Sequence, residues 1–334
     1  MNRTISLCLA TILPALGLVA CSDPSAQSTT EPTEQSLTIV TTTGMITDPT
    51  SIIAGGSNSD YATVTGIMGS GIDPHLYKPT RTDIAKLMDA DVVLYSGLLL
   101  EGRMTDAFVR IASSGITVRA VTEAIDESSL LEPPEFAGHH DPHLWMDPLA
   151  WSLAVNVIAD TLSGADPEHA QDYRSNSTAY QSQIADLHAY AEQVLSTVPE
   201  PQRVLITAHD AFNYFGRRYN YEVVGIQGIS TESEAGVRDI ERIVDLLVER
   251  KIKAVFIETT VSERNINALI AGARARGHEV VIGGSLFSDA MGQEGTYEGT
   301  YIGMIDHNIT TIARALGGDA PESGMNGKLS GTSP

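Results

Sequence analysis

Short apolar runs alternate along the chain with segments whose apolar residues recur every three or four positions. In the first part of the chain, β-branched and apolar runs predict strands at 37–43, 62–68, 92–95 and 116–121. Helical spacing predicts helices at 80–87 and 104–111, and Thr80 or Thr82 could cap the first of them. Strands that alternate with helices in this way indicate βαβ units and a parallel sheet.

Two helical patterns lie near the midpoint of the chain. Residues 149–162 predict one helix and residues 167–195 a longer one. The apolar positions of the longer helix recur three, four or seven residues apart, which puts them on one face. They are Tyr173, Tyr180, Ile184, Leu187, Tyr190 and Val194. At ~1.5 Å per residue this helix would span on the order of 40 Å, enough to join two lobes.

The alternation of strands and helices restarts after the long helix. Strands are predicted at 204–207, 222–226, 254–257 and 280–282, and helices at 211–218, 237–249, 265–276 and 301–316. The sequence therefore predicts an α/β protein with an N-terminal lobe at 37–166, a linking helix at 167–197 and a C-terminal lobe at 198–317. Residues 318–334, rich in Gly, Ser and Pro, are predicted to form a flexible tail.

The first 20 residues have a different pattern. Arg3 is followed by an apolar run without an acid, which is typical of a secretory signal and short for a membrane span. The run ends in Leu18-Val19-Ala20-Cys21, which resembles the lipobox of bacterial lipoproteins. This resemblance implies a signal peptide at 1–20 and a lipidated Cys21; an ordinary signal cut near Ala20 would leave Cys21 as a free thiol. Residues 21–36, rich in Ser and Thr, predict a flexible tether.

Composition narrows the class of function. A length of 334 residues accommodates two domains, and 42% hydrophobic with 19% charged residues is typical of a globular protein. The net charge of −21 argues against nucleic acid as a partner, because phosphates require Lys and Arg. A negative field of this size favours solubility and also attracts cations.

One five-residue pattern occurs twice. Asp73-Pro74-His75-Leu76-Tyr77 and Asp141-Pro142-His143-Leu144-Trp145 share Asp-Pro-His-Leu followed by an aromatic residue. Proline disfavours helix at the residue before it, so each copy predicts a turn or loop that presents one imidazole. A lone histidine is more often a hydrogen-bonded structural residue, but the repetition favours a binding role for His75 and His143.

Two further candidates follow the long helix. His209 comes just after an apolar strand, and Asp289 lies in Phe287-Ser288-Asp289-Ala290-Met291-Gly292, where it could also cap a turn. The gaps from His75 to Asp289 are 68, 66 and 80 residues, so each lobe supplies two candidates. Ligands of parallel sheets collect at the carboxyl ends of strands, and facing lobes would bring all four side chains to one cleft. Imidazoles and a carboxylate suit zinc, manganese or iron.

Several other residues have two interpretations. Asp73, Asp141 and Asp147 could orient the imidazoles as hydrogen-bond acceptors or cap turns. Glu258, which follows an apolar strand, could act as a catalytic base, although a buried structural role is favoured.

The remaining histidines and the pair Gly283-Gly284 give weaker evidence of a function. A solvated loop is favoured for His139 and His140 over a role in guiding metal inward. Gly283-Gly284 is interpreted as a turn, because no phosphate-loop or dinucleotide pattern surrounds it. The remaining histidines on predicted helices or helix ends are interpreted as structural: His169, His188, His278 and His307.

The motifs around the four candidates resemble those of the zinc- and manganese-binding solute-binding proteins of bacterial ABC importers, the TroA-like family in particular. The resemblance covers residues 37–316 and is carried by the two Asp-Pro-His-Leu segments, Thr207-Ala208-His209-Asp210-Ala211-Phe212 and residues 286–292. It implies two Rossmann-like lobes with parallel sheets, joined by one long linking helix, with the metal between them. It also implies that the metal ligands are His75, His143, His209 and Asp289.

Two features bear on which metal the resemblance implies. His209 is similar to the three-histidine members, whereas some manganese-type relatives have Glu at this place. Many zinc-specific relatives have a long loop rich in His and acids before the second histidine motif, where this chain has only Gly138-His139-His140. Zinc and manganese therefore both stay open.

The resemblance implies a monomeric, lipid-tethered receptor without enzymatic activity. Such a receptor would sit in the periplasm or at the cell surface, anchored to the bilayer through Cys21. It would capture zinc or manganese between its lobes and deliver the ion to a membrane permease. One alternative is a zinc hydrolase with Glu258 as base, against which four protein ligands argue. The other is a metal-dependent envelope adhesin.

Overall fold

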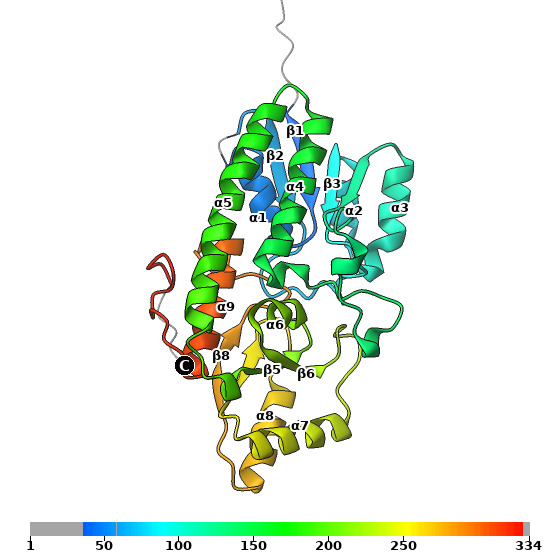
Figure 1. The fold of residues 1–334 in the computed structure, drawn as a ribbon. Helices are drawn as coiled ribbons and strands as arrows, with labels where there is room; N and C mark the ends of the chain where they lie inside the picture. The colour runs from blue at the N-terminus through cyan, green and yellow to red at the C-terminus, as the bar shows by residue number, and fades with distance from the viewer. Residues whose placement is uncertain (1–35, 58, 330–334) are drawn as a thin grey trace, which may run out of the picture. The chain divides into compact units, whose positions relative to one another are not determined.

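The computed structural model describes residues 36–57 and 59–329 (Figure 1). The predicted signal peptide, Cys21 and nearly all of the predicted tether lie outside the described residues. The described residues belong to one unit, in which two lobes are joined by a long helix. The predicted α/β class, with parallel sheets in both lobes, is confirmed.

The N-terminal lobe is built on a four-stranded sheet in the order β2-β1-β3-β4. All three strand pairs are parallel, in agreement with the βαβ pattern. The strands are β1 (Leu37–Thr41), β2 (Ala62–Gly66), β3 (Val92–Tyr95) and β4 (Thr117–Ala120). The helices that connect them are α1 (Gly44–Ile53), α2 (Arg81–Met88) and α3 (Thr105–Ser113). Thr80 caps α2 in a capping box with Asp83, which settles the choice between Thr80 and Thr82.

The helix α1 was not predicted from the sequence. Gly44 begins it and Pro49 lies inside it, and both residues disfavour a helix interior. The helix forms because it buries Met45, Ile46 and Ile53 completely in the core. Tertiary burial here outweighs local propensity, as it does for most helices in proteins.

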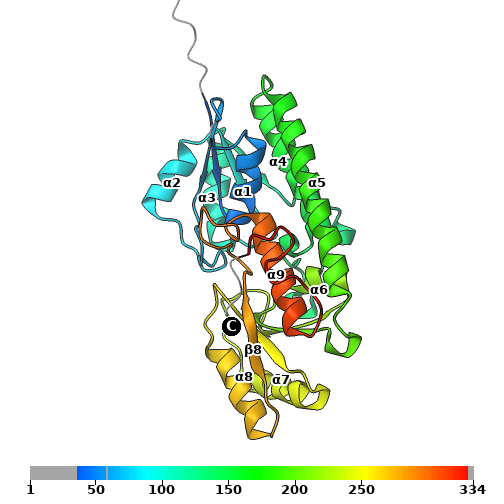
Figure 2. The same ribbon diagram turned by 90° about the vertical axis from the view of Figure 1, so that its left-hand side faces the viewer.

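Two long helices run side by side along one side of the molecule: α4 (Pro148–Ala165) and α5 (Ala170–Leu195), the second of 26 residues and extending from the N-terminal lobe to the C-terminal lobe (Figures 1 and 2). At ~1.5 Å per residue α5 is about 39 Å long. Tyr173, Tyr180, Ile184, Leu187 and Val194 are buried on its inner face, as their spacing predicts. One hydrophobic cluster includes residues of α1, α4, α5 and α9, so the helices share a core with both lobes.

The C-terminal lobe contains two parallel strand pairs, β5–β6 and β7–β8. Its strands are β5 (Val204–His209), β6 (Glu222–Gln227), β7 (Ala254–Glu258) and β8 (Val281–Leu286). Its helices are α6 (Asn213–Tyr219), α7 (Val237–Arg250), α8 (Arg264–Ala275) and α9 (Tyr301–Ala315). Short 3-10 turns across both lobes are η1 (Gly102–Met104), η2 (Glu127–Ser129), η3 (Pro134–Phe136), η4 (Leu144–Met146) and η5 (Glu200–Gln202).

The interpretation of Gly283-Gly284 as a turn is wrong. Both glycines lie inside β8, where the pairing with β7 is irregular between Val255 and Phe256. A Cβ at Gly283 would lie 2.9 Å from Phe256, and a Cβ at Gly284 would lie 2.4 Å from Thr311 of α9. The glycines are needed because α9 packs directly onto the strand.

The segment after α9 returns to the body of the lobe. The backbone N–H of Met325 donates to both carboxylate oxygens of Asp306, at 3.0 and 3.1 Å, and the side chain of Leu329 is 5% exposed. These contacts belong to the described part, 318–329, of the tail that the sequence predicts to be flexible. Across the described ranges, no helix combines the length and hydropathy needed to span a membrane.

Candidate metal centre

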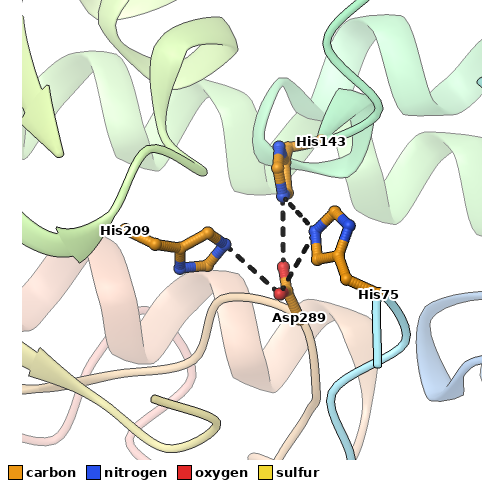
Figure 3. A group of neighbouring side chains, drawn as sticks. All are labelled: His75, His143, His209 and Asp289. Carbon is orange, nitrogen blue, oxygen red and sulfur yellow. Dashed lines mark hydrogen bonds and ion pairs between the residues drawn. The ribbon is translucent and has the colours of Figure 1, made fainter. Parts of the chain in front are cut away.

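Four side chains from four separate segments converge between the lobes (Figure 3). His75 lies in the loop from β2 to α2, and His143 lies just before η4. His209 is the last residue of β5, and Asp289 follows β8. One nitrogen or oxygen from each lies within 4.8 Å of the others, and all four side chains are buried. The four residues singled out in the sequence are thus brought together.

The spacing of these atoms fits a shared ion. The Nε2 atoms of His143 and His209 lie 3.3 and 3.2 Å from the two carboxylate oxygens of Asp289. The Nε2 of His75 lies 3.4 Å from that of His143 and 3.7 Å from Asp289 Oδ2. Ligand atoms 2.0–2.1 Å from a tetrahedral zinc ion would lie about 3.3 Å from one another. The four atoms are therefore already spaced as ligands of one ion.

Three buried atoms in this cluster lack a hydrogen-bond partner. They are Nε2 of His209 and both oxygens of Asp289, whose nearest polar neighbours are the other members of the cluster. Buried polar atoms are rarely left without a partner, because desolvating them costs free energy. Converging lone pairs without donors are what a bound cation requires, so the chemistry of the donor set fits a metal.

Buried carboxylates orient two of the imidazoles from behind. Asp141 Oδ1 lies 2.7 Å from Nδ1 of His143 and also accepts that residue's backbone N–H at 2.9 Å. Glu258 plays the same part for His209, at 2.5 Å from Nδ1. A proton shared between Nδ1 and the carboxylate leaves Nε2 with its lone pair directed at the cluster. Asp141 thus combines the two roles that the sequence left open.

Asp73 and Asp147 have other partners. Asp73 Oδ1 accepts the backbone N–H of His75 at 2.8 Å, so it shapes the turn. Asp147 caps α4 through the backbone N–H groups of Leu149 and Ala150 and pairs with Arg218 at 2.8 Å. Turn or helix capping is therefore the role of these two carboxylates, and neither touches an imidazole of the cluster.

The charges in the cluster are strongly coupled. Burial alone would lower the pKa of His143, but the carboxylates of Asp141 and Asp289 outweigh it and raise the pKa to about 9. In the same way Glu258 and Asp289 overcome burial and raise the pKa of His209 well above its usual value. Burial dominates at His75 and lowers its pKa to about 3. Burial would raise the pKa of Asp289, yet His209 and His143 hold it well below its usual value.

Comparison with known proteins gives the family. The profile of the family described as ZnuA, zinc-uptake complex component A, periplasmic, matches residues 39–315. The chain belongs to this family.

Two relatives are similar to this chain in sequence over most of its length. The manganese-binding lipoprotein MntA of Bacillus subtilis is 45% identical over 310 residues, which are 93% of this chain and 98% of the relative. The zinc-binding protein TroA of Treponema pallidum is 44% identical over 278 residues, 83% of this chain and 88% of the relative. The solved structure of that periplasmic zinc-binding protein matches with a TM-score of 0.81 at 43% identity, covering 84% of this chain and 99% of TroA.

Sequence reasoning missed the contact of Glu258 with His209 in this ZnuA-family centre. Glu258 ends β7 and His209 ends β5, 49 residues earlier, so no local motif joins them. Their positions in the sequence were the only hint of this contact. Each residue ends an apolar strand of the same lobe, and the carboxyl ends of parallel strands lie at one edge of a sheet. The structural interpretation of Glu258 was the better of the two, but it gave no partner.

The other histidines lie outside the cluster. His139 and His140 belong to the loop after η3, and His140 Nε2 lies 3.6 Å from Glu127. The histidines interpreted as structural have hydrogen-bond partners elsewhere. His169 contacts Asp166 and His188 contacts Tyr219, while His278 and His307 contact the backbone carbonyls of Ile252 and Ser285. The ZnuA-family centre is thus confined to the four converging side chains within the described residues.

Proposed function

We propose that the protein binds one divalent transition-metal ion, zinc or manganese, through His75, His143, His209 and Asp289 and delivers it to a membrane permease. The observation that carries this proposal is the convergence of the four buried ligand atoms within 4.8 Å. The description of the family as one component of an uptake complex supports a permease as the partner.

The site can accommodate either metal. Three neutral imidazoles and one carboxylate favour zinc on intrinsic affinity. Both oxygens of Asp289 face the cluster, Oδ1 toward His143 and Oδ2 toward His209. Binding through both oxygens would add the fifth ligand that suits manganese. The two relatives, similar to nearly the same degree, are named for different metals, one for manganese and one for zinc.

Transport, not hydrolysis, fits the geometry of the centre. A catalytic zinc keeps a coordination position open for water and has a base beside it. Here four side chains of the protein converge, and Glu258 lies behind His209, bonded to its Nδ1 and its backbone N–H. Neither the hydrolase nor the adhesin alternative is favoured by the relatives, whose names describe metal-binding proteins.

The remaining parts of the proposal concern organisation. We place the lobes at 37–166 and 198–317 with the linking helix at 167–197, which α5 supports. We propose that the chain is exported with a signal peptide at 1–20, carries lipid on Cys21 and works as a monomer outside the cytoplasm. The name of the lipoprotein relative supports the anchor.

A competition titration tests the proposed function. Purified protein is titrated with zinc and with manganese against a chelator of known affinity, beside the His209→Ala variant. One ion per chain should bind, and the variant should lose far more than the ~100-fold that follows loss of an outer-shell partner. Unchanged binding by the variant would place the ion elsewhere and refute the site.

A further inference from the structure

The four ligand-bearing segments are not held equally. The side chains of His143 and His209 are wholly buried, and a carboxylate fixes the Nδ1 of each. The segment of His75 reaches the surface, since Ile72 and Leu76 on either side are 39% and 42% exposed. Among residues 36–57 and 59–329, no side chain is bonded to the Nδ1 of His75. This imidazole therefore depends on its backbone for its position.

The backbone of His75 is fixed from the opposite lobe. Asp73 accepts the backbone N–H of His75 with Oδ1 at 2.8 Å. Its other oxygen, Oδ2, accepts a hydrogen bond from the hydroxyl of Thr231 at 2.6 Å. Thr231 lies in the segment between β6 and α7 of the C-terminal lobe. One carboxylate thus joins the turn that carries His75 to the facing lobe.

The residue after Thr231 makes a second bridge to the same turn. Glu232 pairs with Arg103 of η1, at 2.8 Å to Nη2 and 2.9 Å to Nε. The Nη1 of Arg103 donates to the backbone carbonyl of Leu76 at 3.4 Å. Thr231 and Glu232 therefore hold the turn on both sides of His75. We call the four residues Asp73, Arg103, Thr231 and Glu232 the clasp.

The clasp differs from two buried contacts between the lobes. Trp145 donates its indole N–H to the carbonyl of Ser288 at 2.9 Å, and Tyr301 donates its hydroxyl to the carbonyl of Trp145. Both aromatic side chains are wholly buried in the core shared with α4 and α5. The side chains of Arg103 and Glu232 are 33% and 51% exposed. Exposed pairs are weak and break readily, so the pair of Arg103 and Glu232 opens more easily than these two buried contacts.

We propose that the clasp sets the rate at which the bound ion leaves. This inference depends on the proposed function, since it concerns release from the same centre. When the contacts of Thr231 with Asp73 and of Glu232 with Arg103 break, the turn that carries His75 moves outward. His75 then no longer coordinates the ion, while His143, His209 and Asp289 stay in place. The ion is left with three protein ligands and an open side facing solvent. A permease that displaces the segment between β6 and α7 would trigger release by the same route.

Dissociation kinetics test the clasp. Protein loaded with zinc is mixed in a stopped-flow instrument with excess chelator at several concentrations, and the rate constant is extrapolated to zero chelator. Thr231→Val removes the hydroxyl at nearly constant shape and should speed release about five-fold, the loss of one hydrogen bond. Glu232→Gln should speed it about two-fold, as for an exposed pair. The double variant should reach about ten-fold, whereas Thr231→Ser should keep the wild-type rate.

Matched controls separate the clasp from general destabilisation. Glu222→Gln breaks another exposed pair of the same lobe, with Arg250, and should leave the rate unchanged. The absorption spectrum of bound Co²⁺ should be the same in the wild type and in Thr231→Val, because the closed site keeps all four ligands. An unchanged rate in the double variant, or an equal change in Glu222→Gln, would overturn the clasp and leave the proposed function standing. Failure of the wild type to bind zinc would overturn both.

Discussion

Glu258 holds His209 at two points. Its Oε1 accepts the backbone N–H of His209 at 2.8 Å, and its Oε2 lies 2.5 Å from the ring Nδ1. Both residues are buried, at 4% and 0% exposure. The carboxylate therefore fixes the position of the imidazole and keeps the lone pair of Nε2 directed at the cluster.

Replacing Glu258 with Gln should weaken metal binding about 10- to 100-fold, the usual effect of losing an outer-shell partner. The amide keeps the shape of the side chain but loses the charge that holds the Nδ1 proton. Chelator competition measures the affinity. Glu241→Gln, on an exposed position of α7, serves as the control and should bind like the wild type. Equal affinities in the two variants would show that His209 needs no carboxylate behind it.

The contact between Glu258 and His209 also marks the limit of sequence reasoning. The repeated Asp-Pro-His-Leu motif was enough to single out His75 and His143, because one pattern twice in a chain is a strong signal. His209 and Asp289 followed from their places after apolar strands. Glu258 could not be predicted as the partner of His209, because the two residues lie 49 positions apart in the sequence and on different strands.

The fold was predictable where burial and local preference agree. The spacing of Tyr173, Tyr180 and Ile184 was sufficient for α5, because a regular apolar stripe specifies a helix. The pattern of apolar residues was insufficient to predict α1 and the full length of β8. There Pro49 and the pair Gly283-Gly284 contradict the element they occupy, and only contacts with distant helices explain them.

The two oxygens of Asp289 predict a difference between metals. Asp289→Asn removes the negative charge and one of the two oxygens that face the imidazoles. Zinc retains three nitrogen ligands, whereas manganese, which prefers oxygen ligands, keeps only one of the two oxygens and loses its negative charge. We therefore expect the affinity for manganese to fall by about ten-fold more than that for zinc, a difference of ~1.4 kcal/mol. Parallel competition titrations measure the ratio, and an equal loss for both metals would contradict binding through both oxygens.

Metal binding should release protons at neutral pH. In the ion-free centre the pKa of His143 is raised to about 9, so this imidazole is protonated at pH 7, while His75, with its pKa lowered to about 3, is neutral. An ion must displace the proton of His143 before it can bind. Affinity should therefore rise with pH up to about 9 and fall as the solution becomes more acidic.

Calorimetry in buffers of different ionisation enthalpy counts the protons released. At pH 7 at least one proton should leave per ion bound, and the number should fall above pH 9. Asp141→Asn removes a carboxylate that raises the pKa of His143, so it should release fewer protons at pH 7. Release of no proton at pH 7 by the wild type would show that His143 is neutral before the ion arrives.

The packing of β8 against α9 predicts opposite effects for two glycines. At Gly284, with φ at +154°, an added Cβ would lie 2.4 Å from Thr311, so alanine there requires α9 to shift. Overpacking of this kind costs about 1–3 kcal/mol of the free energy of unfolding. Gly164, near the end of α4, has nothing within 4 Å of an added Cβ, and alanine there should stabilise the helix by about 0.5–1 kcal/mol. Thermal melting of the two single variants should therefore move in opposite directions. A destabilised Gly164→Ala beside an unaffected Gly284→Ala would contradict this prediction. An unaffected Gly284→Ala would mean that β8 and α9 are not in direct contact, so that they could not support the loop that carries Asp289.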